Sequence, residues 1–371
     1  MKIRNSFQIS ILVLGCCLVV ACNGDSDSAG SDFTEARNQQ TYEWKLVTTW
    51  PKNFPGIGMV SETFADLVEE LSEGRMKIRV YGAGEMVPAL ETFDAVSAGT
   101  AEIGQGASYY WKGKAPEAQF FAALPFGLNG QEMESWIKFG GGMALWEELY
   151  EPFNLIPIPG GNTGVQMGGW FNKEINSLQD FRGLKMRIPG LGGEVLQRVG
   201  GVPINLAASE IYTSLQTNVI DATEFVGPQN DLALGFYDIA DYYYYPGWHE
   251  PGTVLEFIFN KSLFEALPDD LQLIIRTAAE AASSNMTIEA IAQNSFSLDT
   301  LVNEHNVELR QFPDDVSAAL YAVSQQIIDE LGQNSEIGQR ILESYRDFET
   351  VVTRYHDISI EAYNEIRAQQ R

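Results

Sequence analysis

Cysteine is scarce in this sequence, and it is confined to one end. The 371 residues include three cysteines, Cys16, Cys17 and Cys22. Removal of residues 1–21 on export would leave Cys22 alone. A disulfide framework, thiol catalysis and a cysteine-based metal site are therefore excluded for the folded part of the chain. Burial of apolar surface must hold that part together, and it is long enough to do so.

Long apolar runs are also missing, with one exception near the start. Residues 9–21 are uncharged and largely apolar, and they follow the basic Lys2 and Arg4. This run is shorter than the ~20 residues that a transmembrane helix needs. Its length and its basic flank are typical of a secretory signal peptide. We therefore expect residues 1–21 to be a signal peptide and the mature chain to lie outside the cytoplasm, in the periplasm.

The predicted signal peptide ends next to a cysteine. Ala21 directly precedes Cys22, and a small residue at this position resembles the lipobox of bacterial lipoproteins, in which the cysteine is acylated and becomes the new N-terminus. The residues that follow, NGDSDSAGSD, are too polar to fold. The sequence predicts a lipid on Cys22 and a flexible acidic tether over residues 22–41. The alternative is an ordinary signal peptide that happens to end near a cysteine.

Positive charge is in short supply. Lysine and arginine number 24 against 50 aspartates and glutamates, which gives a formal net charge of −26. Loss of residues 1–21 removes Lys2, Arg4 and no acidic residue, so the mature chain carries −28. This charge repels nucleic acid and anionic membrane surfaces, and we expect no nucleic-acid partner. It also repels small anions, so a site for an anion needs positive groups of its own.

The signatures of common enzymes are absent. The chain has no Gly-x-Ser-x-Gly, no phosphate-binding loop and no His-Glu-x-x-His zinc helix. Of three histidines, His305 and His356 lie in polar helical sequence, where we expect them to face solvent. His249 lies in an aromatic, proline-bounded turn and is placed near a site. The sequence therefore does not predict an enzyme.

Strand-like and helical segments alternate over much of the remaining chain. This alternation predicts an α/β fold with mixed, mostly parallel sheets, in two lobes between which the chain crosses more than once. We expect the ligand in the cleft between the lobes. The expected strands are residues 42–50, 76–85, 155–162, 164–171, 184–190, 219–226, 254–260 and 307–312, and the expected helices are 59–72, 192–201, 208–218 and most of the chain from 262 onward. Lobe I is expected to hold mainly residues 42–155 with part of 250–290, and lobe II mainly 156–249 with part of the C-terminal segment.

Several polar residues stand out in these strands. Arg187 lies inside an apolar strand, where an unpaired guanidinium is prohibitively costly to bury. It must form an internal salt bridge or clamp a ligand carboxylate with its planar fork. Gln166 interrupts another strand and Glu224 ends a third. Together with Glu250 they form an oxygen-only set that suits sodium, calcium or magnesium rather than zinc, although each alone is more often a satisfied structural polar group.

Aromatic and amide side chains offer further candidates. Tyr109, Tyr110 and Trp111 are consecutive and are predicted to supply a wall of the cleft and a phenolic hydrogen bond to a ligand. Core packing is the alternative for at least one of them. Asn162 is a candidate amide contact, or a turn former between glycines.

Four segments in order, GNTGVQMGGWF, GLKMRIPGLGGEVLQRVGG, EIYTSLQTNVIDATEFVGPQND and YYPGWHEPG, resemble the solute-binding subunits of tripartite ATP-independent periplasmic (TRAP) transporters. The resemblance covers residues 42–371 and is nearest to receptors for 2-oxo and 2-hydroxy acids such as pyruvate or lactate. It implies a two-lobe periplasmic-binding-protein-like fold with a long C-terminal helical region. It also implies delivery of the ligand to a membrane permease, and related receptors include dimers, so we expect a homodimer.

The resemblance assigns roles to particular residues. It implies that Arg187 meets the ligand carboxylate and that sodium or calcium bridges ligand and protein. The metal ligands fall on Gln166, Glu224, the backbone carbonyl of Phe225 and Glu250. Phe225 stands where this branch commonly has tryptophan, which alters the wall of the ligand pocket. The alternatives are a TRAP receptor for a sugar acid or dicarboxylate without metal and, more remotely, an extracellular lyase or hydrolase with Glu224 as base.

Overall fold

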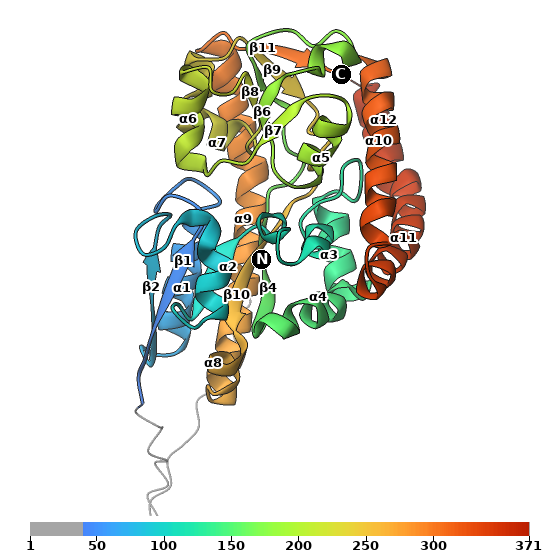
Figure 1. Cartoon of the computed structure of the whole chain (residues 1–371). Coiled ribbons are helices and arrows are strands. Elements are labelled where there is room, and N and C mark those ends of the chain that lie inside the picture. Colours follow the sequence, from blue (N-terminus) through green and yellow to red (C-terminus); the bar gives the residue numbers. More distant parts are fainter. Residues whose placement is uncertain (1–39, 371) are drawn as a thin grey trace, which may run out of the picture. The chain divides into compact units, whose positions relative to one another are not determined.

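The computed structural model describes residues 40–370 (Figure 1). The predicted signal peptide, the lipid on Cys22 and almost all of the predicted tether lie outside these residues. The described part forms one unit that begins at Gln40. None of its helices combines the length and the apolar character needed to cross a membrane.

The first lobe is built on a five-stranded sheet. Its strands are β1 (Tyr42–Thr48), β2 (Met76–Tyr81), β3 (Ile103–Gly106), β4 (Leu155–Asn162) and β10 (Val254–Asn260), in the order β2-β1-β3-β10-β4. β1 pairs in parallel with β2 and β3, whereas β10 is antiparallel to β3 and β4. The helices of this lobe are α1 (Met59–Leu71), α2 (Thr92–Ser97), α3 (Gly130–Phe139), α4 (Gly142–Tyr150) and α8 (Lys261–Glu265).

Both faces of this sheet are buried, which explains the apolar run VLEFIFN in β10. Val254 and Ile258 face the core beneath α2, α3 and α4. Leu255 and Phe257 face the opposite core, where α1 packs. Successive side chains of a strand point to opposite faces, so a strand covered on both sides needs apolar residues at nearly every position.

Glu256 is the exception in this strand. Its Oε1 accepts hydrogen bonds from Trp111 Nε1 and, at 3.1 Å, from the Tyr150 hydroxyl, whereas its buried Oε2 has no partner in the described part of the chain. Burial raises the pKa of Glu256 to about 8, and the two hydrogen bonds oppose this shift only in part. The folded chain therefore holds Glu256 as a neutral acid at pH 7. Trp111 is a core residue that supports it rather than a wall of the cleft.

The Glu256→Gln variant should gain stability relative to the parent as pH rises. The folded pKa of Glu256, about 8, lies above its ordinary value of 4.5. In the parent, this proton contributes to the free energy of unfolding, fully below pH 4.5, and the contribution is lost as pH rises through about 8. Glutamine carries no such proton. Denaturant unfolding at pH 5 and pH 8 should show the unfolding free energy of the variant rising by about 3–4 kcal/mol relative to that of the parent. A difference in unfolding free energy that does not change with pH would contradict the assignment of Glu256 as a neutral acid.

The second lobe is built on a six-stranded sheet. Its strands are β5 (Gly169–Phe171), β6 (Lys185–Arg187), β7 (Val202–Ile204), β8 (Ala222–Thr223), β9 (Tyr242–Tyr245) and β11 (Glu308–Gln311), in the order β11-β9-β5-β8-β6-β7. β6 pairs in parallel with β7 and β8, and β11 with β9, whereas β5 is antiparallel to both neighbours. The helices of this lobe are α5 (Gly190–Arg198), α6 (Ala208–Gln216) and α7 (Pro228–Leu234).

The structure corrects several of the sequence-based boundaries. β4 begins at Leu155 but belongs to the first lobe because it pairs with β10, so the boundary between the lobes falls after Asn162 rather than at residue 155. The expected strand 164–171 begins only at Gly169, and the strand expected over 219–226 is reduced to β8. α3, α4, β7 and β9 were not predicted, since glycines obscure the first two and the tyrosines of β9 resemble an aromatic turn.

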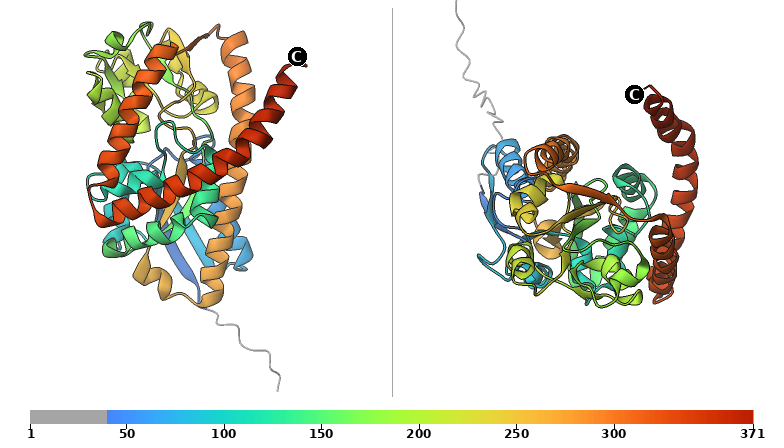
Figure 2. Two further views of the ribbon diagram at one scale, coloured as in Figure 1. Left: turned by 90° about the vertical axis from the view of Figure 1, so that its right-hand side faces the viewer. Right: turned by 90° about the horizontal axis from the view of Figure 1, so that it is seen from above.

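Long helices connect the two lobes. α9 (Asp269–Asn303) packs on α1 and β4 in the first lobe and on α7 in the second. α10 (Asp314–Gly332) packs on α5, and α11 (Glu336–His356) packs on α3 and α4. A π-helical turn (Asp357–Glu361) and α12 (Ala362–Ala368) follow, and this C-terminal segment projects away from the body (Figure 2).

The end of α11 contradicts one prediction about histidine. His356 is buried, and its Nδ1 lies 2.5 Å from Glu132 Oε1 in α3. The polar sequence around His356 concealed this partner, which lies more than two hundred residues earlier in the chain. His305 is exposed, as expected, and its ring lies 3.9 Å from that of Tyr237.

Candidate functional site

Two neighbouring strand ends bring an arginine and a glutamate together. Arg187 is the last residue of β6, and Glu224 directly follows β8. These strands are parallel, with Arg187 opposite Thr223, and the Glu224 amide donates to the Arg187 carbonyl at 3.1 Å. The carboxyl ends of parallel strands are the usual edge for ligands in an α/β lobe. Both side chains are almost fully buried, at 1% and 0% exposure.

Arg187 is held in a fixed orientation. Its Nη1 forms an ion pair with Glu224 Oε1 and donates to the Glu224 carbonyl at 3.0 Å. Its Nε donates to the Leu206 carbonyl at 3.3 Å, its Nη2 to the Tyr110 hydroxyl at 3.2 Å, and it lies over the ring of Phe225. Burial alone would lower the pKa of Arg187, but the Glu224 carboxylate and its other neighbours raise the pKa above its usual value. The guanidinium is therefore permanently charged.

Two segments that pass between the lobes supply the rest of the polar cluster. Gln166 lies between β4 and β5, and Glu250 lies between β9 and β10. The backbone amide of Gln166 donates to the Glu250 carbonyl at 3.2 Å, which is why this stretch is not a strand. Gln166 Nε2 and the Thr253 hydroxyl donate to Glu250 Oε2 at 2.7 and 2.6 Å.

His249 completes the cluster. Its Nε2 lies 3.1 Å from Glu224 Oε2, and its side chain is 1% exposed. One ligand atom each from Glu224, His249 and Glu250 lie within 4.8 Å of one another. The sequence placed His249 near a site but gave it no partner, since only the fold brings residues 224 and 249 together.

The cluster fits a hard cation. Gln166 Oε1 is buried and, among residues 40–370, has no hydrogen-bond donor. Burial and the neighbouring Glu224 carboxylate raise the pKa of Glu250 to about 7. Two buried carboxylates and an unsatisfied amide oxygen are the groups that a cation would stabilise. Glu224, Glu250, Gln166 and the carbonyl of Phe225, next to Glu224, offer the oxygen atoms that sodium and calcium prefer.

Aromatic side chains close the cluster from the first lobe. Tyr109 and Tyr110 lie in a short 3₁₀ helix (Ser108–Trp111), and the Tyr109 hydroxyl donates to Glu250 Oε2 at 3.4 Å. Burial raises the pKa of both tyrosines, so they remain neutral donors. Phe225 is buried, and its ring lies edge-on to Phe54 of the first lobe.

Asn162 has a structural role in this arrangement. Its Oδ1 accepts from the Gly164 amide at 2.8 Å, and its Nδ2 donates to the carbonyls of Gly130 and Gly252 at 3.3 and 3.4 Å. All of its polar atoms are engaged with backbone groups. The predicted amide contact with a ligand is therefore not supported, and Asn162 instead fixes the start of the segment that carries Gln166.

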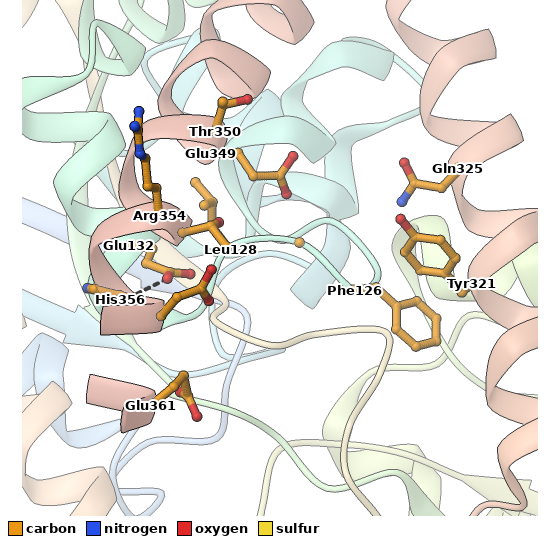
Figure 3. Close-up of a pocket in the computed structure, with 13 residues that line it drawn as sticks. Phe126, Leu128, Glu132, Tyr321, Gln325, Glu349, Thr350, Arg354, His356 and Glu361 are labelled. Carbon is orange, nitrogen blue, oxygen red and sulfur yellow. Dashed lines mark ion pairs between the residues drawn. The ribbon is translucent and has the colours of Figure 1, made fainter. Parts of the chain in front are cut away.

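A cavity of 230 Å³ lies between the lobes, beside Tyr109 and Tyr110. Its lining includes Tyr109, Tyr110, Ile188, Pro189 and Pro203. A larger hollow of 660 Å³ lies elsewhere, among α3, α10 and α11, and shares none of these residues (Figure 3). It contains the His356–Glu132 ion pair. The smaller cavity meets the polar cluster only at Tyr109 and Tyr110, which contact Glu250 and Arg187; the side chains of Arg187, Gln166, Glu224 and Glu250 do not line it.

Two α/β lobes joined by crossing segments, with a buried arginine and an oxygen cluster between them, define a periplasmic-type solute-binding protein. Residues 46–334 match the family of bacterial extracellular solute-binding proteins, family 7. The chain belongs to this family, whose members serve TRAP transport and are not enzymes.

Similar proteins are known in several bacteria. The monocarboxylate 2-oxoacid-binding periplasmic protein of Nostoc is 40% identical over 86% of this chain and 87% of its own length. TRAP solute-binding proteins of Colwellia psychrerythraea, with bound calcium and pyruvate, and of Pseudoalteromonas atlantica, with bound sodium and pyruvate, are each 42% identical over 88% of this chain and 99% of theirs, with TM-scores of 0.85 and 0.86. A Bordetella bronchiseptica protein, a dimer with calcium and picolinate, is 35% identical over 89% of this chain and 98% of its own, with a TM-score of 0.87.

Proposed function

We propose that this protein captures a small 2-oxo or 2-hydroxy monocarboxylate, such as pyruvate or lactate, together with sodium or calcium, and delivers it to a TRAP permease. The observation that carries the proposal is the buried Arg187 beside a cluster of oxygen atoms that includes the unsatisfied Gln166 Oε1. Arg187 binds the carboxylate. Gln166, Glu224, Glu250 and the Phe225 carbonyl hold the cation, which neutralises their charge and attracts the oxygen beside the carboxylate.

The site's position explains capture and release. Tyr109 and Tyr110 belong to the first lobe, Arg187 belongs to the second, and Gln166 and Glu250 lie on the segments between them. A ligand that contacts both lobes stabilises the closed arrangement, and opening at these segments separates its contacts. The local positive charge of Arg187 and the cation overcomes the repulsion that the net charge exerts on an anion.

A thermal-shift screen tests the ligand class. Small monocarboxylates, a dicarboxylate and a sugar acid would be added to the purified protein in sodium, in calcium and with chelator. A ligand that binds only the folded state raises the melting temperature by mass action. We expect shifts for pyruvate and lactate that depend on the cation. A shift for a dicarboxylate or sugar acid alone, without cation, would favour the metal-free alternative.

The C-terminal helix supports a homodimer. α12 has no buried residue, and its Tyr363 and Ile366 are 60% and 62% exposed; Ile358, in the preceding π-helical turn, is 77% exposed. Apolar side chains on a projecting helix are suited to burial against a second copy. Sedimentation of the full chain should give twice the monomer mass, and Ile358→Glu with Ile366→Glu should reduce it to the monomer. A monomeric parent at micromolar concentration would contradict this assignment.

A lipid on Cys22 would keep the receptor at its own membrane. The acidic tether of residues 22–41 then sets the distance over which it can load. Mass spectrometry of the mature N-terminus should show an acylated Cys22, and Cys22→Ser should release the protein from the membrane. An unmodified terminus beyond residue 22 would mean a free periplasmic receptor.

A further inference from the structure

Each oxygen of the Glu224 carboxylate contacts a different side chain. Its Oε1 forms an ion pair with Arg187 Nη1, and its Oε2 lies 3.1 Å from His249 Nε2. Building on the proposed function, we propose that His249 is a positioning residue for the cation. It holds the Glu224 carboxylate in the orientation that coordinates the ion, without becoming a ligand itself.

The backbone around His249 fixes its ring in place. The Gly247 amide donates to the Gln166 carbonyl at 2.8 Å. The Trp248 carbonyl accepts from the Phe126 amide at 2.7 Å, and the two aromatic rings stack with centroids 5.7 Å apart. The segment that carries His249 is thus tied to the segment that carries Gln166 and to the first lobe.

Helix α5 confines the histidine from the other side. A Cβ added at Gly192 would lie 2.9 Å from the His249 Cβ, closer than such contacts occur. Only glycine lets the helix lie against this side chain. Gly192 thus fixes how closely α5 approaches the base of the His249 side chain, while the 3.1 Å contact of Nε2 with Glu224 Oε2 orients the ring.

The hydrogen bonding of the ring indicates a donor rather than a metal ligand. His249 Nδ1 is buried and has no partner within residues 40–370, so a proton there would be unsatisfied. The proton then lies on Nε2 and is donated to Glu224. A histidine that ligates a metal normally donates its other nitrogen to a carboxylate or carbonyl, which Nδ1 does not do. Each carboxylate oxygen accepts two partners, so the bond leaves Oε2 free to bind the cation as well.

The loss of such a partner lowers metal affinity by about 10–100-fold in comparable sites. The variants His249→Gln and His249→Asn separate this positioning role from packing. Glutamine can place its amide nitrogen near the position of Nε2, whereas asparagine places it near Nδ1, out of reach of Glu224. Both are neutral, polar and smaller than histidine.

Calorimetry with calcium alone, and then with pyruvate in saturating calcium, tests the proposal on the full chain. His249→Gln should bind calcium within about threefold of the parent, and His249→Asn should bind it about 10–100-fold more weakly. Both should melt near the parent in chelator and bind pyruvate once calcium saturates. Equal calcium affinity in the two variants would overturn the role. So would a loss of calcium affinity in His249→Asn that is accompanied by a lower melting temperature without metal, because the loss would then reflect packing. A parent that binds pyruvate but neither calcium nor sodium would overturn it together with the metal assignment, while leaving the carboxylate clamp standing.

Discussion

Arg187→Ala should lose about thirtyfold to a few thousandfold in affinity for pyruvate, because truncation of a buried hydrogen-bonded charge pair costs about 2–5 kcal/mol. It should also destabilise the fold. Glu224, the partner of Arg187, is fully buried, and removal of one member of a buried ion pair typically costs about 3–5 kcal/mol. Calorimetry and thermal unfolding of the same preparation would measure both losses.

A second variant separates the two effects. Arg187→Ala combined with Glu224→Gln removes the unpaired charge, so the melting temperature should recover toward that of the parent, which assigns the loss of stability to the broken ion pair. Arg187→Lys keeps the charge but lacks the planar fork, so it should fold and bind weakly. Tight pyruvate binding by a folded Arg187→Ala protein would show that this arginine is not the carboxylate clamp.

Cation removal should have the second-largest effect. Without sodium or calcium, the Glu224 and Glu250 carboxylates lie close together in a buried site and repel an incoming anion. Pyruvate affinity should fall by about a hundredfold or more, corresponding to about 2.7 kcal/mol. Titration in a potassium buffer with chelator, followed by addition of sodium or calcium, measures it.

Glu224→Gln is the matched variant for this experiment. It keeps the shape of the side chain but removes a charge from the cation site, so addition of calcium should restore little of the lost affinity. The parent serves as the reference. Undiminished pyruvate binding by the parent in cation-free buffer would support a receptor that needs no metal.

The sequence singled out Arg187 and Glu224 as candidate site residues, and it placed only Glu224 at a strand end. The local pattern placed Arg187 inside an expected strand over residues 184–190 and Glu224 at the end of another. The structure ends the first strand at Arg187, which brings both residues to one edge of the sheet. The same pattern left open whether Arg187 forms a salt bridge or a ligand clamp. The buried ion pair with Glu224 shows that the salt bridge exists, and the proposed function adds the ligand to the same guanidinium.

Contacts between distant segments could not be predicted in this way. β10 enters the first sheet between β3 and β4 after the chain has built most of the second lobe. Because β4 pairs with β10, the first lobe extends to Asn162 rather than ending at residue 155. Gln166 looked like a strand residue because its hydrogen-bonding partners near Glu250 lie about eighty residues later. Asn162 looked like a ligand contact because Gly130 and Gly252, which satisfy its amide, are distant in sequence.

A crystal structure of the purified protein with calcium and pyruvate tests the central claim most directly. The pyruvate carboxylate should lie against the Arg187 guanidinium. A cation should contact Gln166 Oε1, Glu224, Glu250 and the Phe225 carbonyl, with an oxygen of pyruvate completing its shell. Pyruvate bound away from Arg187, or an occupied clamp with no cation near Glu224 in saturating calcium, would contradict the account.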